Sequence, residues 1–132
     1  MSVPTGMRAE VKAVDASAVA ALLFREPNAD AVASRLENAR LVAPALIDYE
    51  LANVCLMKLR RHPAQRDALL TAFSLRDNLG IEGLAVNQLE VLTLAAASGL
   101  TAYDASYLWI AHSFGAELVT LDKRLALAAA HE

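Results

Sequence analysis

Four acidic residues stand at positions from which a carboxylate could do chemistry: Asp15, Glu50, Asp104 and Asp122. Asp15 and Asp122 each follow a short apolar run that is typical of a strand, and each can cap the helix that follows. Asp104 comes three residues after Thr101, the spacing of a capping box. Taken one at a time, these three acids are therefore explained by helix capping.

Glu50 is harder to explain as a structural residue. Leu46 and Ile47 precede it by four and three residues and Val54 follows by four, which places it on the apolar stripe of a helix. A carboxylate on a buried stripe costs free energy unless it has a partner. That partner is either a bound cation or the basic side chain of a buried ion pair, and both alternatives stay open from the spacing alone.

Considered together, the four acids predict a site for a hard cation. Carboxylate oxygens and water are the usual ligands of Mg²⁺ and Mn²⁺. The chain has one cysteine and three scattered histidines, so no zinc cluster is expected. One or two hard cations held in this way suit phosphodiester hydrolysis, because they activate a water molecule, orient the phosphate and neutralise the leaving oxygen.

Strands and helices that alternate along the chain must position these acids. Strands are expected at 11–14, 41–43, 81–86 and 117–121, with Pro44 stopping the second; helices are expected at 16–24, 28–38, 46–61, 64–77, 88–98, from Thr101 to Gly115, and at 122–130. The alternation predicts a parallel sheet covered by helices on both faces. In such a sheet, sites lie beyond the carboxyl ends of the strands, where Asp15 and Asp122 are expected.

Length and composition limit the class of protein. A chain of 132 residues with 56% hydrophobic residues is expected to form a single domain, residues 1–132, with residues 1–8 as a flexible lead. The net charge of −3 weakens a nucleic-acid interpretation without removing it. No apolar run reaches the ~18 residues of a membrane span. The single cysteine, Cys55, is typical of a reducing compartment, so a cytoplasmic protein is expected.

Several stretches of the chain resemble one known family. They are Val14–Ser17, Tyr49–Val54, Leu100–Ala111 and Leu118–Asp122, and the similarity extends from about Val11 to Ala130. These stretches resemble the PIN-domain nucleases and, more narrowly, the VapC-type toxins of bacterial toxin–antitoxin pairs. No single stretch is specific, but the four acids in this order and setting make a strong combined pattern.

The resemblance implies a Rossmann-like PIN domain, an α/β/α sandwich with a central parallel sheet of four to five strands. It implies an endoribonuclease, dependent on Mg²⁺ or Mn²⁺, that cleaves structured RNA of the tRNA or rRNA class. Asp15, Glu50 and Asp104 match the core acids of the family, Asp122 matches the fourth, and Ser17 and Thr120 match polar residues that line the site. A cognate antitoxin and a homodimer are also implied.

Two questions stay open in the sequence. Lys58, Arg60 and Arg61 follow Glu50 on the same expected helix and could contact RNA phosphates, but cations at a helix C-terminus are often only solvated. The alternative to an enzyme is a catalytically silent PIN-like binding or scaffolding protein. A P-loop or dinucleotide site is excluded, because residues 14–19 contain no glycine.

Overall fold

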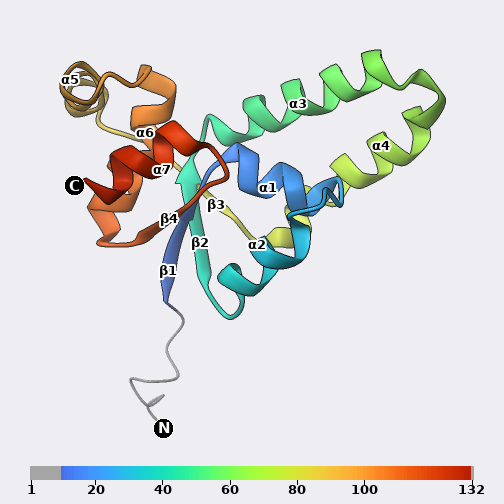
Figure 1. The fold of residues 1–132 in the computed structure, drawn as a ribbon, viewed down its shortest axis with the longest axis horizontal. Helices are drawn as coiled ribbons and strands as arrows, with labels where there is room; N and C mark the ends of the chain where they lie inside the picture. Colours follow the sequence, from blue (N-terminus) through green and yellow to red (C-terminus); the bar gives the residue numbers. More distant parts are fainter. Residues whose placement is uncertain (1–9, 132) are drawn as a thin grey trace, which may run out of the picture.

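A four-stranded parallel sheet forms the centre of the fold in the computed structural model, which describes residues 10–131. The strands are β1 (Val11–Val14), β2 (Arg40–Pro44), β3 (Glu82–Leu84) and β4 (Glu117–Val119), in the spatial order β3-β2-β1-β4 (Figure 1). β1 pairs with β2 on one side and with β4 on the other. The first strand of the chain is therefore central, and the residues that follow β1 and β4 lie side by side.

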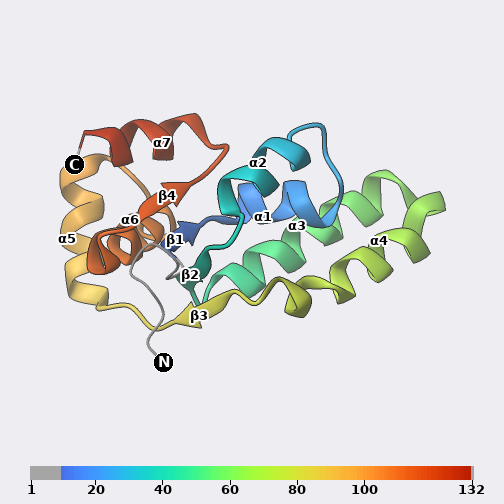
Figure 2. The same cartoon turned by 90° about the horizontal axis from the view of Figure 1, so that it is seen from below.

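Helices connect and cover the strands. They are α1 (Ala16–Leu23), α2 (Ala29–Leu36), α3 (Ile47–Arg61), α4 (Arg66–Ser74), α5 (Gln88–Ser98), α6 (Ala102–Phe114) and α7 (Lys123–Ala130), with 3-10 helices η2 (Pro63–Gln65) and η3 (Arg76–Leu79) flanking α4. α5 and α6 lie on one side of the sheet, and α1, α2 and α3 lie on the other (Figure 2). The described chain is an α/β/α sandwich, as the sequence predicts.

The core joins the sheet to helices on both sides. Its fully buried side chains include Val14 and Val119 from the central strands, Val19 from α1, and Tyr107 and Leu108 from α6. α3 and α4 instead form an antiparallel arm that extends away from the sheet (Figures 1 and 2). No helix within residues 10–131 combines the length and apolarity needed to cross a membrane.

Local residues explain where α5 ends and α6 begins. Gly99 ends α5 with a φ of 73°, in the left-handed region that favours glycine. Two residues later, the Thr101 hydroxyl accepts the backbone N–H of Asp104 at 3.1 Å and caps α6. This turn places Asp104 at the start of a helix that packs on the sheet.

The expected bounds of four elements were wrong. β2 extends through Pro44, which pairs with Leu84, rather than ending before it. Proline has no N–H to donate, but the next residue keeps the strands together, because the Ala45 N–H donates to the Leu84 carbonyl at 2.9 Å. The third strand is limited to Glu82–Leu84, and the fourth ends at Val119 rather than at Leu121. The expected helix at 64–77 is divided among η2, α4 and η3.

Some expectations are not tested by the structure. The expected flexible lead, residues 1–8, lies outside the described residues. The extent of the domain over residues 1–132 remains a prediction for the same reason.

Candidate active site

Asp15 is the most deeply buried of the four acids. It follows β1, caps α1 and has 5% of its surface exposed. Its Oδ1 accepts the Ala18 backbone N–H at 3.1 Å and the Ser17 hydroxyl at 2.7 Å, and its Oδ2 accepts the Thr120 hydroxyl at 2.6 Å. Burial raises the pKa of Asp15, although these hydrogen bonds oppose the rise.

Ser17 and Thr120 tie two turns of the chain together at this carboxylate. The Ser17 hydroxyl accepts the backbone N–H of Leu121, and the Thr120 hydroxyl accepts that of Asp122, each at 2.9 Å. Each hydroxyl thus donates to Asp15 and accepts from the β4–α7 turn. The two side chains fix the position of Asp15 relative to Asp122.

Glu50 comes from α3 and is half-buried. Its Oε1 accepts a hydrogen bond from the hydroxyl of Tyr107, a fully buried side chain of α6. Burial raises the pKa of Glu50, and repulsion from Asp104 and Asp15 raises it further. Burial raises the pKa of Tyr107, and its hydrogen bond to Glu50 and the charges of Glu50, Asp15 and Asp104 raise it further. The Tyr107 hydroxyl therefore remains neutral and donates to Glu50.

Asp104 lies in the first turn of α6 and is also half-buried. Burial raises its pKa, and repulsion from Asp122 raises it further. The Thr101 hydroxyl and the positive charge of Arg124 partly offset this rise. Asp104 is therefore electrostatically linked to both Glu50 and Asp122.

Asp122 is exposed and follows β4, where its Oδ1 accepts the Leu125 backbone N–H at 3.0 Å and caps α7. Its charge raises the pKa of both Asp15 and Asp104. The structure thus gathers all four acids at the carboxyl edge of the sheet, where each interacts electrostatically with two of the others. We call Asp15, Glu50, Asp104 and Asp122 the acidic cluster.

The acidic cluster has the donor chemistry of a hard-cation site. None of the ion pairs between residues 10 and 131 includes a member of the cluster, and the charge of Arg124 only partly offsets the repulsion at Asp104. Carboxylate oxygens flanked by hydroxyls suit Mg²⁺ or Mn²⁺. Within the described residues, however, no three acidic, histidine or cysteine side chains already stand close enough together to form a complete metal site. The donor types of the acidic cluster fit such a cation, although the side chains lie too far apart to surround one.

The basic residues singled out in the sequence do not join the acidic cluster. Lys58 forms an ion pair with Glu26 at 3.2 Å and lies 5.2 Å from the centre of the Phe24 ring. Arg60 and Arg61 lie at the exposed end of α3, on the extended arm. Their contact with RNA therefore stays a prediction.

Tyr107 is a site residue that the sequence analysis missed. It lies three residues after Asp104, on the same face of α6, and this spacing was available in the sequence. Its hydrogen bond to Glu50 joins residues 57 positions apart, which no local pattern reveals.

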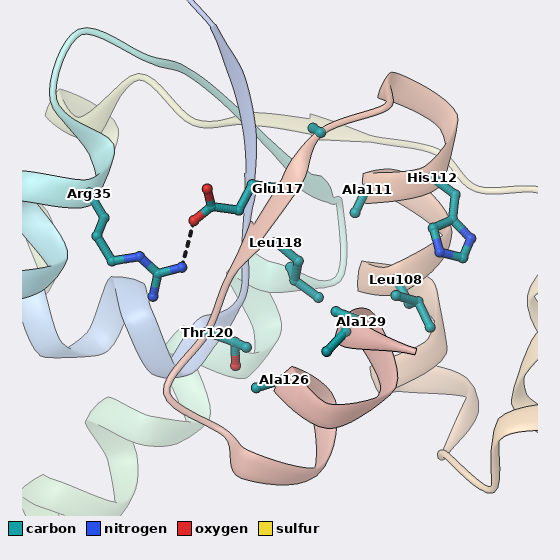
Figure 3. Close-up of a pocket in the computed structure, with 11 residues that line it drawn as sticks. Arg35, Leu108, Ala111, His112, Glu117, Leu118, Thr120, Ala126 and Ala129 are labelled. Atoms are coloured by element: carbon teal, nitrogen blue, oxygen red, sulfur yellow. Dashed lines mark hydrogen bonds and ion pairs between the residues drawn. The ribbon is translucent and has the colours of Figure 1, made fainter. Parts of the chain in front are cut away.

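A cavity of about 350 Å³ beside β4 is a separate feature (Figure 3). Leu108, Leu118, Ala126 and Ala129 form the apolar part of its walls, and the Arg35–Glu117 ion pair, at 2.6 Å, lies along it. Of the residues proposed for the site, only Thr120 lines this cavity. It holds no member of the acidic cluster and offers no comparable chemistry.

Comparisons with known proteins agree with this geometry. The PIN domain family model matches residues 12–130. Ribonuclease VapC9 of Mycobacterium tuberculosis is 37% identical over 118 residues, which cover 86% of this chain and 87% of the relative. Ribonuclease VapC3 of Pyrobaculum aerophilum is 32% identical over 118 residues, which cover 86% of this chain and 90% of the relative. The crystal structure of PAE2754 from Pyrobaculum aerophilum superimposes with a TM-score of 0.73 at 31% identity and covers 92% of this chain and 86% of that one.

Proposed function

This chain belongs to the PIN domain family, and from that premise we propose that it is a metal-dependent endoribonuclease of the VapC type, the toxin of a toxin–antitoxin pair. The observation that carries the proposal is the acidic cluster. Three of its members have raised pKa values, and no ion pair between residues 10 and 131 neutralises them. The relatives carry the name ribonuclease, and a phosphodiester is a substrate that such a cluster can process with a cation.

Asp15, Glu50, Asp104 and Asp122 would hold Mg²⁺ or Mn²⁺. When bound, a cation of this class supplies water activation and charge neutralisation at the leaving oxygen. Ser17 and Thr120 hold Asp15 in one orientation through their hydrogen bonds. Tyr107 occupies one oxygen of Glu50 and leaves the other available as a ligand.

The proposal extends to the partners of the protein. The substrate would be structured RNA, of the tRNA or rRNA class, with Lys58, Arg60 and Arg61 as candidate contacts to flanking phosphates. The names of the relatives support a cognate antitoxin as the inhibitor of the toxin. A homodimer and a cytoplasmic location follow from the same family resemblance and belong to the proposal.

The test is cleavage of a total-RNA pool by the purified full chain, with Mg²⁺ or Mn²⁺ and separately with EDTA. Asp15→Asn removes one carboxylate charge, and Asp67→Asn is the matched control because its side chain is 99% exposed on the arm. We expect discrete fragments from the wild-type and Asp67→Asn proteins with metal, and none from Asp15→Asn. No cleavage by antitoxin-free wild-type protein would instead favour a catalytically silent scaffold.

A further inference from the structure

A smaller pocket lies beside the acidic cluster at the carboxyl edge of the sheet. Its volume is about 280 Å³, and it is formed by the ends of β2 and β3 and the starts of α3, α5 and α6. The lining residues that matter here are Leu46, Leu84, Val86, Gln88, Tyr103 and Ser106. We call this cavity the edge pocket.

The edge pocket adjoins the acidic cluster through two helices. Tyr103 directly precedes Asp104 in α6, and the carbonyl of Leu46 accepts the backbone N–H of Glu50 at 3.1 Å. β2 and β3 are one and two strands away from β1, a distance of roughly 5–10 Å across the sheet. A nucleotide next to one held at the acidic cluster would therefore lie over this pocket.

The chemistry of the edge pocket suits a flat heterocycle. Leu46, Leu84 and Val86 give it apolar walls, and Tyr103 is 65% exposed and presents an aromatic ring. The exposed Gln88 amide carries both donors and an acceptor, and no hydrogen-bond partner for it is found within residues 10–131. The Ser106 hydroxyl donates to the Tyr103 carbonyl, which leaves Gln88 as the available polar side chain.

We propose that the edge pocket binds one unpaired nucleobase of the RNA, stacked on Tyr103 and hydrogen-bonded along its edge by Gln88. The inference rests on the proposed ribonuclease function and deepens it. The lining contains no charged side chain, so the pocket suits a base rather than a phosphate. A base that is already paired cannot enter, which directs cleavage to loops and other unpaired positions.

Binding is measured with fluorescein-labelled hexaribonucleotides rA6, rC6 and rU6 and with a blunt-ended RNA duplex that has no loop, in Mg²⁺, on an Asp15→Asn background that does not cleave. Loss of a base–aromatic stack weakens binding by about 5- to 150-fold. We expect that loss for Tyr103→Ala, little change for Tyr103→Phe, and weaker binding of the duplex than of the single strands. Gln88→Ala should reduce the differences in affinity among the three oligonucleotides.

Two matched controls separate the pocket from general surface effects. Tyr49→Ala removes another tyrosine next to a cluster acid, one that is 80% exposed and is not among the residues lining the edge pocket. Gln65→Ala removes an amide from the arm. Both controls should bind like the parent protein.

The same variants, made on the cleavage-competent wild-type chain, are then mapped for their cleavage positions. Gln88→Ala should change which base lies next to the cut, and Tyr103→Ala should raise KM more than it lowers kcat. A structural role alone would not alter base preference.

The outcomes distinguish the two proposals. If the wild-type protein cleaves RNA with metal, but Tyr103→Ala and Gln88→Ala keep the parent affinity and cleavage positions, the base-binding proposal is overturned. The ribonuclease proposal is then retained. Tyr103-dependent binding without cleavage by wild-type protein would support the pocket and overturn the nuclease. Absence of oligonucleotide binding, or equal losses in Tyr103→Ala and Tyr49→Ala, would also overturn the pocket.

Discussion

The two edges of the sheet carry the same residue types in opposite electrostatic settings. At the amino edge, Arg35 pairs with Glu117 at 2.6 Å and Arg40 pairs with Glu82 at 2.7 Å. Hydrogen bonds from these arginines lower the pKa of both glutamates. At the carboxyl edge, burial and mutual repulsion instead raise the pKa values of Asp15, Glu50 and Asp104.

The difference shows where the protein neutralises its charges and where it does not. The Glu117 side chain is 52% exposed and forms an ion pair with Arg35, so its charge is neutralised without a bound cation. Asp15 is 5% exposed and interacts electrostatically with two other acids, Asp122 and Glu50. The carboxyl edge is therefore the place where an external cation would relieve repulsion, and each prediction below tests that contrast.

The largest effect is expected for Asp104→Asn. Loss of a residue that only supports a metal ligand typically lowers metal affinity or activity about 10- to 100-fold. Loss of a proposed ligand itself should therefore lower RNA cleavage by at least about 100-fold. The fold should be retained or stabilised, because one repelling charge is removed. RNA cleavage and thermal unfolding measure the two effects. If this variant cleaved RNA at the rate of the wild-type protein, Asp104 would be excluded from the mechanism.

A smaller effect separates the two roles of Asp122. Asp122→Ala removes the cap of α7 and should lower the free energy of unfolding by about 1 kcal/mol. Asp122→Asn keeps a capping oxygen and should preserve stability while it removes the charge. Urea unfolding of both variants provides the measurement, and equal losses of stability would contradict the capping role.

The pH dependence of stability should differ between the two edges. The folded protein binds protons at Asp15, Glu50 and Asp104 more tightly than the unfolded chain, so their contribution is present at low pH and is lost as pH rises through the raised pKa values. Glu82 and Glu117 act in reverse: their contribution is present above the ordinary value of 4.5 and is lost as pH falls.

Urea unfolding in EDTA from pH 3 to pH 8 tests these signs. Asp104→Asn should flatten the decline in stability at higher pH, and Glu117→Gln should flatten the decline at lower pH. Curves that run parallel to wild type in both variants would contradict the assignment of the pKa shifts.

The smallest effect is expected for Glu117→Gln at neutral pH. It breaks an exposed ion pair, which contributes about 0.2–1 kcal/mol. Thermal unfolding should shift only slightly, and RNA cleavage should be unchanged. A loss of cleavage comparable to that of Asp104→Asn would remove the distinction between the two edges.

The sequence predicted the sandwich, two acids that follow strands, one acid in a first helical turn and Glu50 on a partly buried helix face, because strand runs, caps and apolar stripes are local patterns. It did not predict that Tyr107 donates to Glu50 or that Lys58 pairs with Glu26, since those contacts join distant parts of the chain. Pro44 was misjudged because a proline can close a strand when the next residue supplies the hydrogen bond. The roles of the site residues remain predictions.

The central claim is that the acidic cluster binds a divalent cation, and electron paramagnetic resonance of free Mn²⁺ tests it most directly. Titration of wild-type protein into Mn²⁺ should diminish the free-ion signal with saturation. Asp15→Asn should weaken that binding at least about tenfold, since it alters a proposed ligand, whereas Glu117→Gln at the amino edge should bind like wild type. Equal binding by all three proteins, or none by wild type, would contradict the account.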